Sequence, residues 1–371
     1  MEIDRRSFLA TLGVAIGSSL APRAALAAEP VYVSACADAK GVHHLAAFSL
    51  DGRLKFATTL PSRGHDMTLR PGGRELVVFA RRPGNWMAVI DPGTGGVRKV
   101  IPAAAGRSFY GHGAFSDDGR LLFATENQGD TGEGIVGTYD ADAGYARIGE
   151  MPTSGPGPHD LVFLPGGERL VIANGGERTE AASREVVNEG ALESSLAILR
   201  TGTGDVEGRI ELARDLRNLS IRHLACSPDG ETVFGCQFRG DPFDVVPLVG
   251  ILTSEGRAVF LEMPEDDLAS LENYIGSVSL DRSGDIIAAT SPHGNIVAFW
   301  DRKSRRYLGR QSMSDVCGIA AAQDSATFLV TSGNAGAGLT RIEGKAIERV
   351  GGDLERWSWD NHALWLDSSV D

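Results

Sequence analysis

Apolar and polar residues alternate along this chain in one recurring pattern of strands and turns. A short strand starts at a histidine, a turn containing glycine closes it seven residues later, and a second apolar strand follows. Four units keep this spacing: His65 to Gly72, His112 to Gly119, His159 to Gly166 and His223 to Gly230. The same phase continues from Ser277 to Gly284 and from Cys317 to Asp324. A spacing that recurs through the chain predicts a fold built from repeats.

The segments between the turns have the composition of buried strands. Runs such as Leu76–Phe79, Leu121–Phe123 and Leu170–Ile172 are apolar, and helical periodicity is rare. Units of about 40 to 64 residues leave room for four strands each, so we predict an all-β propeller. Two segments, 177–195 and 265–274, interrupt the pattern, and we expect both to form short helices.

The two ends of the chain indicate how the ring closes. Residues 31–60 contain only three strands and lack an inner strand before them, whereas residues 361–366 supply one more strand at the C-terminus. One C-terminal and three N-terminal strands would complete a last blade and remove the open edges. With six complete units, this arrangement predicts seven blades.

The N-terminus has the pattern of an export signal. Arg5 and Arg6 precede a short apolar stretch interrupted by glycines, and Ala25-Leu26-Ala27 supplies small residues for cleavage. We therefore expect a twin-arginine signal peptide at 1–27, a propeller at 28–371 and a periplasmic location. The apolar stretch is too short to cross a bilayer of roughly 30 Å, so we expect no membrane span.

Charge narrows the range of partners. The chain carries a formal net charge of −13, with 42% hydrophobic and 23% charged residues. An acidic body argues against nucleic acid as a partner. We expect a monomer.

Five of the eight histidines fall at the start of predicted inner strands, where antiparallel order places them around one face of the ring. Two interpretations remain open. The imidazoles could satisfy the backbone of neighbouring blades, or they could converge on a transition metal such as iron, copper or zinc. The candidate metal ligands are His65, His112, His159, His223, Cys317 and His362.

The loops between second and third strands open on the same face and carry polar side chains, as a binding surface requires. The candidate ligand-binding residues there are Arg81, Arg82, Glu126, Asn127, Asn174, Gln237, Arg239 and His293. We expect no nucleotide, because Gly132–Gly137 matches a dinucleotide fingerprint but leads into a strand rather than a helix. No Cys-x-x-Cys-His occurs, so we expect no covalent haem.

Several motifs resemble, in the same order, a bacterial family known as domain of unknown function fifteen-thirteen. They are Phe109–Gly113, Thr125–Asn127, Gly157–His159, Ala173–Gly176, Ile221–Ala225 and Tyr274–Ser277. The resemblance implies a periplasmic, twin-arginine-exported propeller associated with imelysin-like iron-uptake proteins, and it adds Arg184 to the candidate ligand-binding residues. Members carry Thr-His-Pro after Asn-Gly-Gly, whereas this chain has Arg178-Thr179-Glu180.

These observations favour an accessory, non-enzymatic protein that binds a metal ion, a small polar ligand or a metal-carrying iron-uptake partner at the channel mouth. The alternative is a lactonase or oxidoreductase of the propeller type, with ring histidines in acid–base roles beside Glu126 or Arg81. A pure protein-interaction platform is the third possibility, because the propeller fold hosts many functions.

Overall fold

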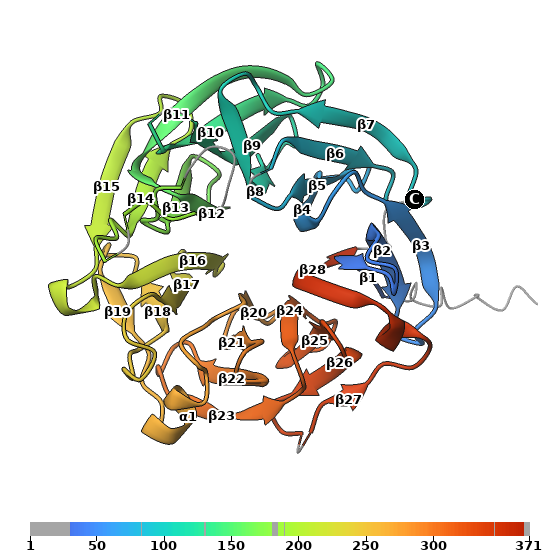
Figure 1. The fold of residues 1–371 in the computed structure, drawn as a ribbon, viewed down its shortest axis with the longest axis vertical. Coiled ribbons are helices and arrows are strands. Elements are labelled where there is room, and N and C mark those ends of the chain that lie inside the picture. The colour runs from blue at the N-terminus through green and yellow to red at the C-terminus, as the bar shows by residue number, and fades with distance from the viewer. Residues whose placement is uncertain are drawn as a thin grey trace, which may run out of the picture.

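The computed structural model describes residues 30–366 except 83, 130, 180–184, 189 and 345. Within that part of the chain, seven four-stranded antiparallel sheets surround a central channel (Figure 1). The predicted seven-bladed all-β propeller is confirmed. The expected signal peptide at 1–27 and Arg184 lie outside the described residues.

Each blade runs outward from an inner strand. The first three blades are β4 (Gly64–Leu69), β5 (Leu76–Ala80), β6 (Trp86–Ile90) and β7 (Val97–Pro102); β8 (Arg107–Phe115), β9 (Leu121–Gln128), β10 (Glu133–Asp140) and β11 (Ala146–Pro156); and β12 (Pro158–Phe163), β13 (Arg169–Asn174), β14 (Ser195–Arg200) and β15 (Val206–Glu211).

The next three blades have the same order. They are β16 (Leu219–Cys226), β17 (Thr232–Phe238), β18 (Val249–Leu252) and β19 (Ala258–Phe260); β20 (Ser277–Leu280), β21 (Ile286–Ser291), β22 (Ile296–Asp301) and β23 (Tyr307–Ser312); and β24 (Val316–Ala321), β25 (Thr327–Ser332), β26 (Gly336–Arg341) and β27 (Glu348–Arg349).

The seventh blade joins the two ends of the chain, as predicted. Its inner strand is β28 (Ser358–Leu366), followed outward by β1 (Val31–Ala37), β2 (His43–Ser49) and β3 (Leu54–Thr59). In Figure 1 the C-terminal β28 lies on the channel side of the N-terminal β1. The inner strands of successive blades pack against one another around the whole ring, including β28 against β4 and β24.

The turns between first and second strands explain the recurring glycine. In the second blade, the Ser116 hydroxyl donates a hydrogen bond to Asp118 over 2.6 Å, and Gly119 takes a φ of 68°. Ser227, Asp229 and Gly230 repeat this arrangement in the fourth blade. A left-handed φ costs glycine little, so the glycine fixes the turn and with it the phase of the next strand.

Helices are short and few among the described residues. They are α1 (Glu265–Ala269) and the 3₁₀ turns η1 (Arg214–Leu216) and η2 (Leu354–Arg356). The helix expected within 265–274 is confirmed. The helix expected within 177–195 is wrong for the described part of that segment, which instead contains an isolated bridge between Thr179 and Val186. The segment connects β13 to β14, and Glu177 and Arg178 form ion pairs with residues of other blades.

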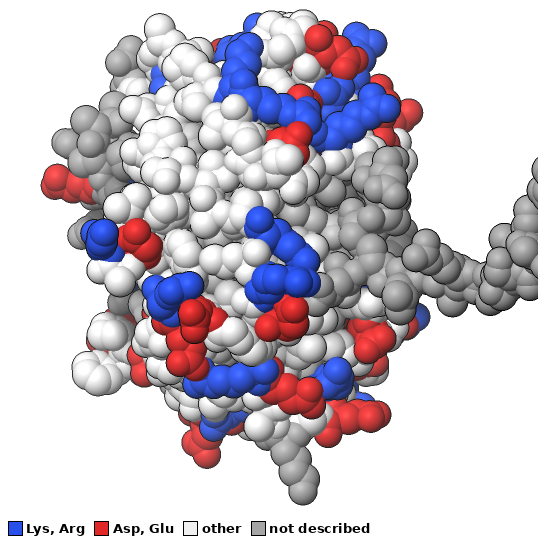
Figure 2. All heavy atoms as spheres, turned by 90° about the vertical axis from the view of Figure 1, so that its right-hand side faces the viewer, with Lys and Arg blue, Asp and Glu red and all other residues white. Residues whose placement is uncertain are grey.

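The core lies between the sheets, where aromatic and aliphatic side chains such as Phe79, Phe109 and Trp300 are fully buried. At the rim, acidic and basic side chains lie next to one another (Figure 2). None of the described helices is long and apolar enough to cross a membrane.

Candidate metal centre

The ring residues are the seven residues at the start of the predicted inner strands: five histidines, Ser277 and Cys317. At most of these positions the regular pairing between the inner strand and its neighbour is interrupted. In the first four blades and the sixth, the register between first and second strands shifts at or next to the ring residue, and β28 has a similar shift against β1. A bulge leaves extra residues on one strand and re-aims their side chains. The shifts span His65, His112, His159, Cys317 and the segment 360–362, and in the fourth blade the shift passes over Arg222, directly before His223. In the fifth blade, Ser277 pairs regularly with Thr290.

The five ring histidines converge inside the channel. The ring centroid of His112 lies 4.9 Å from that of His65, 4.8 Å from that of His159 and 4.7 Å from that of His362. His223 closes the group at 4.9 Å from both His159 and His362. Four of the five are buried and His159 is partly buried. The sequence predicted the ring but not its burial below the channel mouth.

Several nitrogens of this cluster are buried and have no hydrogen-bond partner among the described residues. They are Nε2 of His112, Nδ1 of His159, both ring nitrogens of His223 and Nε2 of His362. The possible ligand atoms of His112, His159 and His223 lie within 4.8 Å of one another, and those of His65, His112 and His362 meet the same limit. Each unsatisfied buried polar atom costs about 1–3 kcal/mol, so this grouping requires an explanation.

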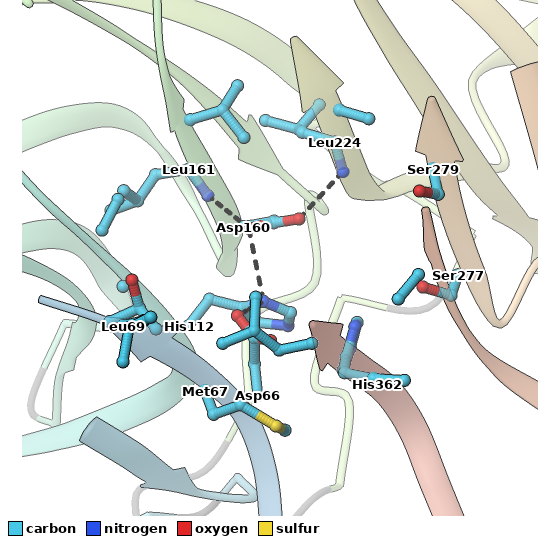
Figure 3. Close-up of a pocket in the computed structure, with 18 of the residues that line it drawn as sticks. Asp66, Met67, Leu69, His112, Asp160, Leu161, Leu224, Ser277, Ser279 and His362 are labelled. Atoms are coloured by element: carbon cyan, nitrogen blue, oxygen red, sulfur yellow. Dashed lines mark hydrogen bonds and ion pairs between the residues drawn. The ribbon is translucent and has the colours of Figure 1, made fainter. Parts of the chain in front are cut away.

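Two carboxylates hold His112 in place (Figure 3). Its Nδ1 lies 3.1 Å from Asp66 Oδ2 and 3.3 Å from Asp160 Oδ1. The Asp160 carboxylate is itself fixed by the backbone amides of Leu161 and Leu224, which donate over 2.7 and 2.8 Å. Burial favours neutral imidazole, but Asp160 and Asp66 outweigh it and raise the pKa of His112 to about 10. With this pKa His112 carries protons on both nitrogens at neutral pH, so its Nε2 would have to lose a proton before it could bind a metal ion.

The other cluster histidines are held in the neutral form. Burial lowers the pKa of His65 well below its usual range, even though its Nδ1 lies 3.3 Å from Asp360. Burial also lowers the pKa of His159, with the charge of Arg222 adding to the effect, and lowers that of His223. Neutral imidazoles with free lone pairs are the form that binds metals.

The histidine layer separates two cavities of the channel. On one side lies a cavity of about 600 Å³, lined by Asp66, Asp160 and Ser277 together with apolar side chains such as Leu224 (Figure 3). On the other side lies a small cavity of about 30 Å³ whose lining is rich in arginine. His112 and His362 face the larger cavity, whereas His65, His159 and His223 face the smaller one.

Four of the predicted ligand-binding residues lie together around the smaller cavity. Arg81 and Arg82 follow β5, and Gln237 and Arg239 lie at the end of β17. Arg239 donates to Gln237 Oε1 over 3.0 Å, and Gln237 donates to the carbonyl of Ile275. The loops between the second and third strands of these blades therefore lie on the same side of the propeller as the histidine layer.

Three other predicted residues point elsewhere, into the blades. Glu126 is fully buried and accepts hydrogen bonds from Tyr139 (2.5 Å) and Arg147 (2.9 Å). The amide of Asn127 faces the carbonyls at the β9–β10 turn, and that of Asn174 donates to the Thr153 carbonyl. Glu126 and Asn127 bond within their own blade, whereas Asn174 bonds both to β11 of the neighbouring blade and to Ser195 of its own.

The remaining candidates lie apart from the cluster. His293 is exposed and stacks on Tyr274 with ring centroids 4.2 Å apart. The Cys317 thiol is directed to the carbonyls of Trp359 and Asp360, 3.3 Å from each, and burial raises its pKa. Cys317 is in neither histidine group.

The sequence reasoning missed five polar residues of this region. Asp66 and Asp160 directly follow ring histidines, so the recurring His-Asp pair was a usable signal. Arg222 directly precedes His223, whereas Tyr110 lines the cavity from the second blade and Glu177 forms an ion pair with Arg222. The Tyr110 hydroxyl lies 3.1 Å from Arg82 and 3.2 Å from Thr179. Such contacts between blades do not produce a repeating pattern in the sequence.

Comparisons with known proteins agree on the fold. A search of the curated proteins found no match. Among solved structures, the chain is similar to Kuenenia stuttgartiensis hydrazine synthase, with a TM-score of 0.62 and 14% sequence identity over 80% of this chain and 89% of that one. At this identity the likeness concerns the propeller alone. Residues 58–366 match the family described as "Protein of unknown function (DUF1513)". The order of motifs, the seven blades and this match together show that the chain belongs to the DUF1513 family.

Proposed function

We propose that this protein binds one transition-metal ion in the histidine layer of its channel. The observation that carries the proposal is the set of buried imidazole nitrogens without a partner among the described residues. His112 Nε2, His159 Nδ1 and a nitrogen of His223 would be the first ligands, and His65 and His362 lie close enough to complete the coordination.

The spacing of the nitrogens supports this assignment. Two nitrogens bound to one ion at roughly 2.0–2.1 Å can be at most about 4.2 Å apart. The His112, His159 and His223 ligand atoms lie within 4.8 Å of one another. Small rotations of the rings would therefore bring them to bonding distance. Imidazole ligands suit iron, copper and zinc.

Carboxylates surround the proposed histidine ligands, as they do in many metal sites. Asp66 and Asp160 fix the orientation of His112, and Asp360 holds Nδ1 of His65. Carboxylates behind ligating histidines orient the ring and raise its basicity. They would also balance the charge of a divalent ion in a buried site.

The location and biological role are part of the same proposal. The paired Arg5 and Arg6 with the following apolar stretch support twin-arginine export to the periplasm. The family resemblance supports a role beside iron-uptake proteins, in which the propeller would hold or pass on a metal without chemical conversion.

Acid–base catalysis is the competing proposal. A general base works best when its pKa is near the working pH. The carboxylates raise the pKa of His112 to about 10, whereas burial lowers the pKa values of His65, His159 and His223. These shifts move the histidines away from the useful range. The lowered pKa values keep His65, His159 and His223 in the neutral form that binds metals, whereas an entering ion would have to displace a proton from His112.

The test is the metal content of protein exported through its own signal and purified without chelators or an affinity histidine tag. Elemental mass spectrometry should find near-stoichiometric iron, copper or zinc in the native protein. The double variant His112→Ala, His159→Ala should lose it, whereas the exposed control His293→Ala should keep it. A folded, metal-free native protein that does not take up any of the three ions would refute the proposal.

A further inference from the structure

The small cavity beside the histidine layer has an unusual concentration of positive charge for an acidic protein. Four arginines from two blades line it: Arg81, Arg82, Arg222 and Arg239. The cavity also contacts three histidines of the metal centre, so whatever occupies it would touch both the arginines and the metal ligands.

One carboxylate balances part of this charge. Glu177 is buried and ion-pairs with Arg222, with Arg239 at 2.8 Å and with Arg82 at 3.2 Å. A single carboxylate thus faces three guanidinium groups, which leaves an excess of positive charge around the cavity.

Some hydrogen-bond donors of these arginines also lack an acceptor. Arg222 is buried, yet its Nε has no hydrogen-bond partner in the described part of the chain. Among the described residues, no hydrogen bond or ion pair reaches the guanidinium of Arg81. Burial and the charge of Arg63 lower the pKa of Arg81, so an added negative charge would relieve both effects. Unpartnered buried donors beside an excess of positive charge require an acceptor.

We propose that this cavity binds a small oxyanion, which bonds to Arg81 and Arg222 and supplies an oxygen ligand to the metal ion. The coupling to the metal rests on the proposed function, whereas anion binding to the arginines does not. Guanidinium groups bind carboxylate, carbonate and phosphate oxygens through paired hydrogen bonds.

The size of the cavity limits the anion. A volume of about 30 Å³ holds roughly two water-sized groups. Formate, with three heavy atoms, is nearest to this size, hydrogencarbonate and phosphate are larger, and a nucleotide or a peptide is far larger. The neighbouring Tyr110 and Tyr274 hydroxyl-bearing rings and the Asn361 amide offer further neutral polar groups around such an anion.

The test is calorimetric titration of sodium formate, sodium hydrogencarbonate and potassium phosphate, each into metal-free and cobalt(II)-loaded protein. Arg81→Gln is the informative variant, because no described residue forms a hydrogen bond or ion pair with the Arg81 guanidinium and its loss leaves the Glu177 ion pairs intact. Arg257→Gln, an exposed arginine outside the cavity, is the matched control. We expect at least one anion to bind, with affinity roughly tenfold weaker or more in Arg81→Gln and unchanged in the control.

The visible bands of bound cobalt provide a second readout. Addition of the anion should shift them in the native protein, and Arg81→Gln should need roughly tenfold more anion for the same shift. Cobalt binding without any anion binding would overturn this inference and leave the metal site standing. Anion binding by a protein that takes up no cobalt would support the arginine site and refute its coupling to a metal. Equal anion affinity in the native protein and Arg81→Gln would overturn the assignment to this cavity.

Discussion

The Glu177 carboxylate should be one of the largest single contributors to the stability of the channel. Its side chain is 2% exposed, and that of its partner Arg222 is 4% exposed. Replacing Glu177 with Gln keeps the shape but leaves the buried Arg222 facing an uncharged amide. Removing one member of a buried ion pair typically costs about 3–5 kcal/mol, because the other charge remains buried without compensation.

The effect should depend on pH in a defined direction. Burial alone would raise the pKa of Glu177, but the charges of Arg222, Arg239 and Arg82 lower it well below its usual range. A carboxylate with a lowered folded-state pKa stabilises the protein above its unfolded pKa of about 4.5 and loses that contribution as the pH falls further. The native protein and Glu177→Gln should therefore differ most at neutral pH and converge in acid.

Equilibrium urea unfolding at several pH values measures both effects. The matched control is Glu168→Gln, because Glu168 is 80% exposed and its one ion pair with a described residue, Arg200, spans 3.6 Å. The control should change the free energy of unfolding by about 0–1 kcal/mol. A loss below about 1 kcal/mol in Glu177→Gln at neutral pH, or a difference that grows in acid, would refute the reasoning.

Three further predictions concern the metal centre. Asp160→Asn should weaken metal affinity about 10- to 100-fold, because the carboxylate orients His112; a competition titration with a chelator of known affinity measures this, and unchanged affinity would contradict it. Cys317→Ser should keep the native metal content in elemental mass spectrometry, because the thiol is directed to backbone carbonyls; loss of the metal would reinstate Cys317 as a ligand. Lowering the pH should release the metal, since protons compete for the imidazole nitrogens; dialysis at a series of pH values should show retention at neutral pH and loss in acid, and retention throughout would exclude histidine ligands.

Periodic features of the fold could be predicted from the sequence. The histidine-to-glycine spacing recurs because each blade places the same turn after the same inner strand, so blade number and the ring position followed directly. The closure by β28 and β1 was visible because one strand was missing at one end and present at the other. The same repeat spacing predicted that the five histidines lie at equivalent positions in their blades.

The directions of side chains within a blade were harder to predict from the sequence. Glu126 and Asn174 lie near loops in sequence, yet Glu126 has its partners inside its own sheet and Asn174 donates to Thr153 of the neighbouring sheet. A shift of one residue along a strand reverses the face of a side chain, and sequence spacing does not resolve such a shift at strand ends. Contacts between blades, such as Arg222 with Glu177, depend on closure of the ring and leave no local pattern.

The most direct test of the metal centre is an anomalous diffraction measurement on crystals of the exported protein, collected on both sides of the iron, copper and zinc absorption edges. The account predicts one strong peak within the histidine layer, at bonding distance from nitrogens of His112, His159 and His223. Full-occupancy metal bound elsewhere, or an ordered histidine layer without an anomalous peak in protein soaked with each ion, would contradict it.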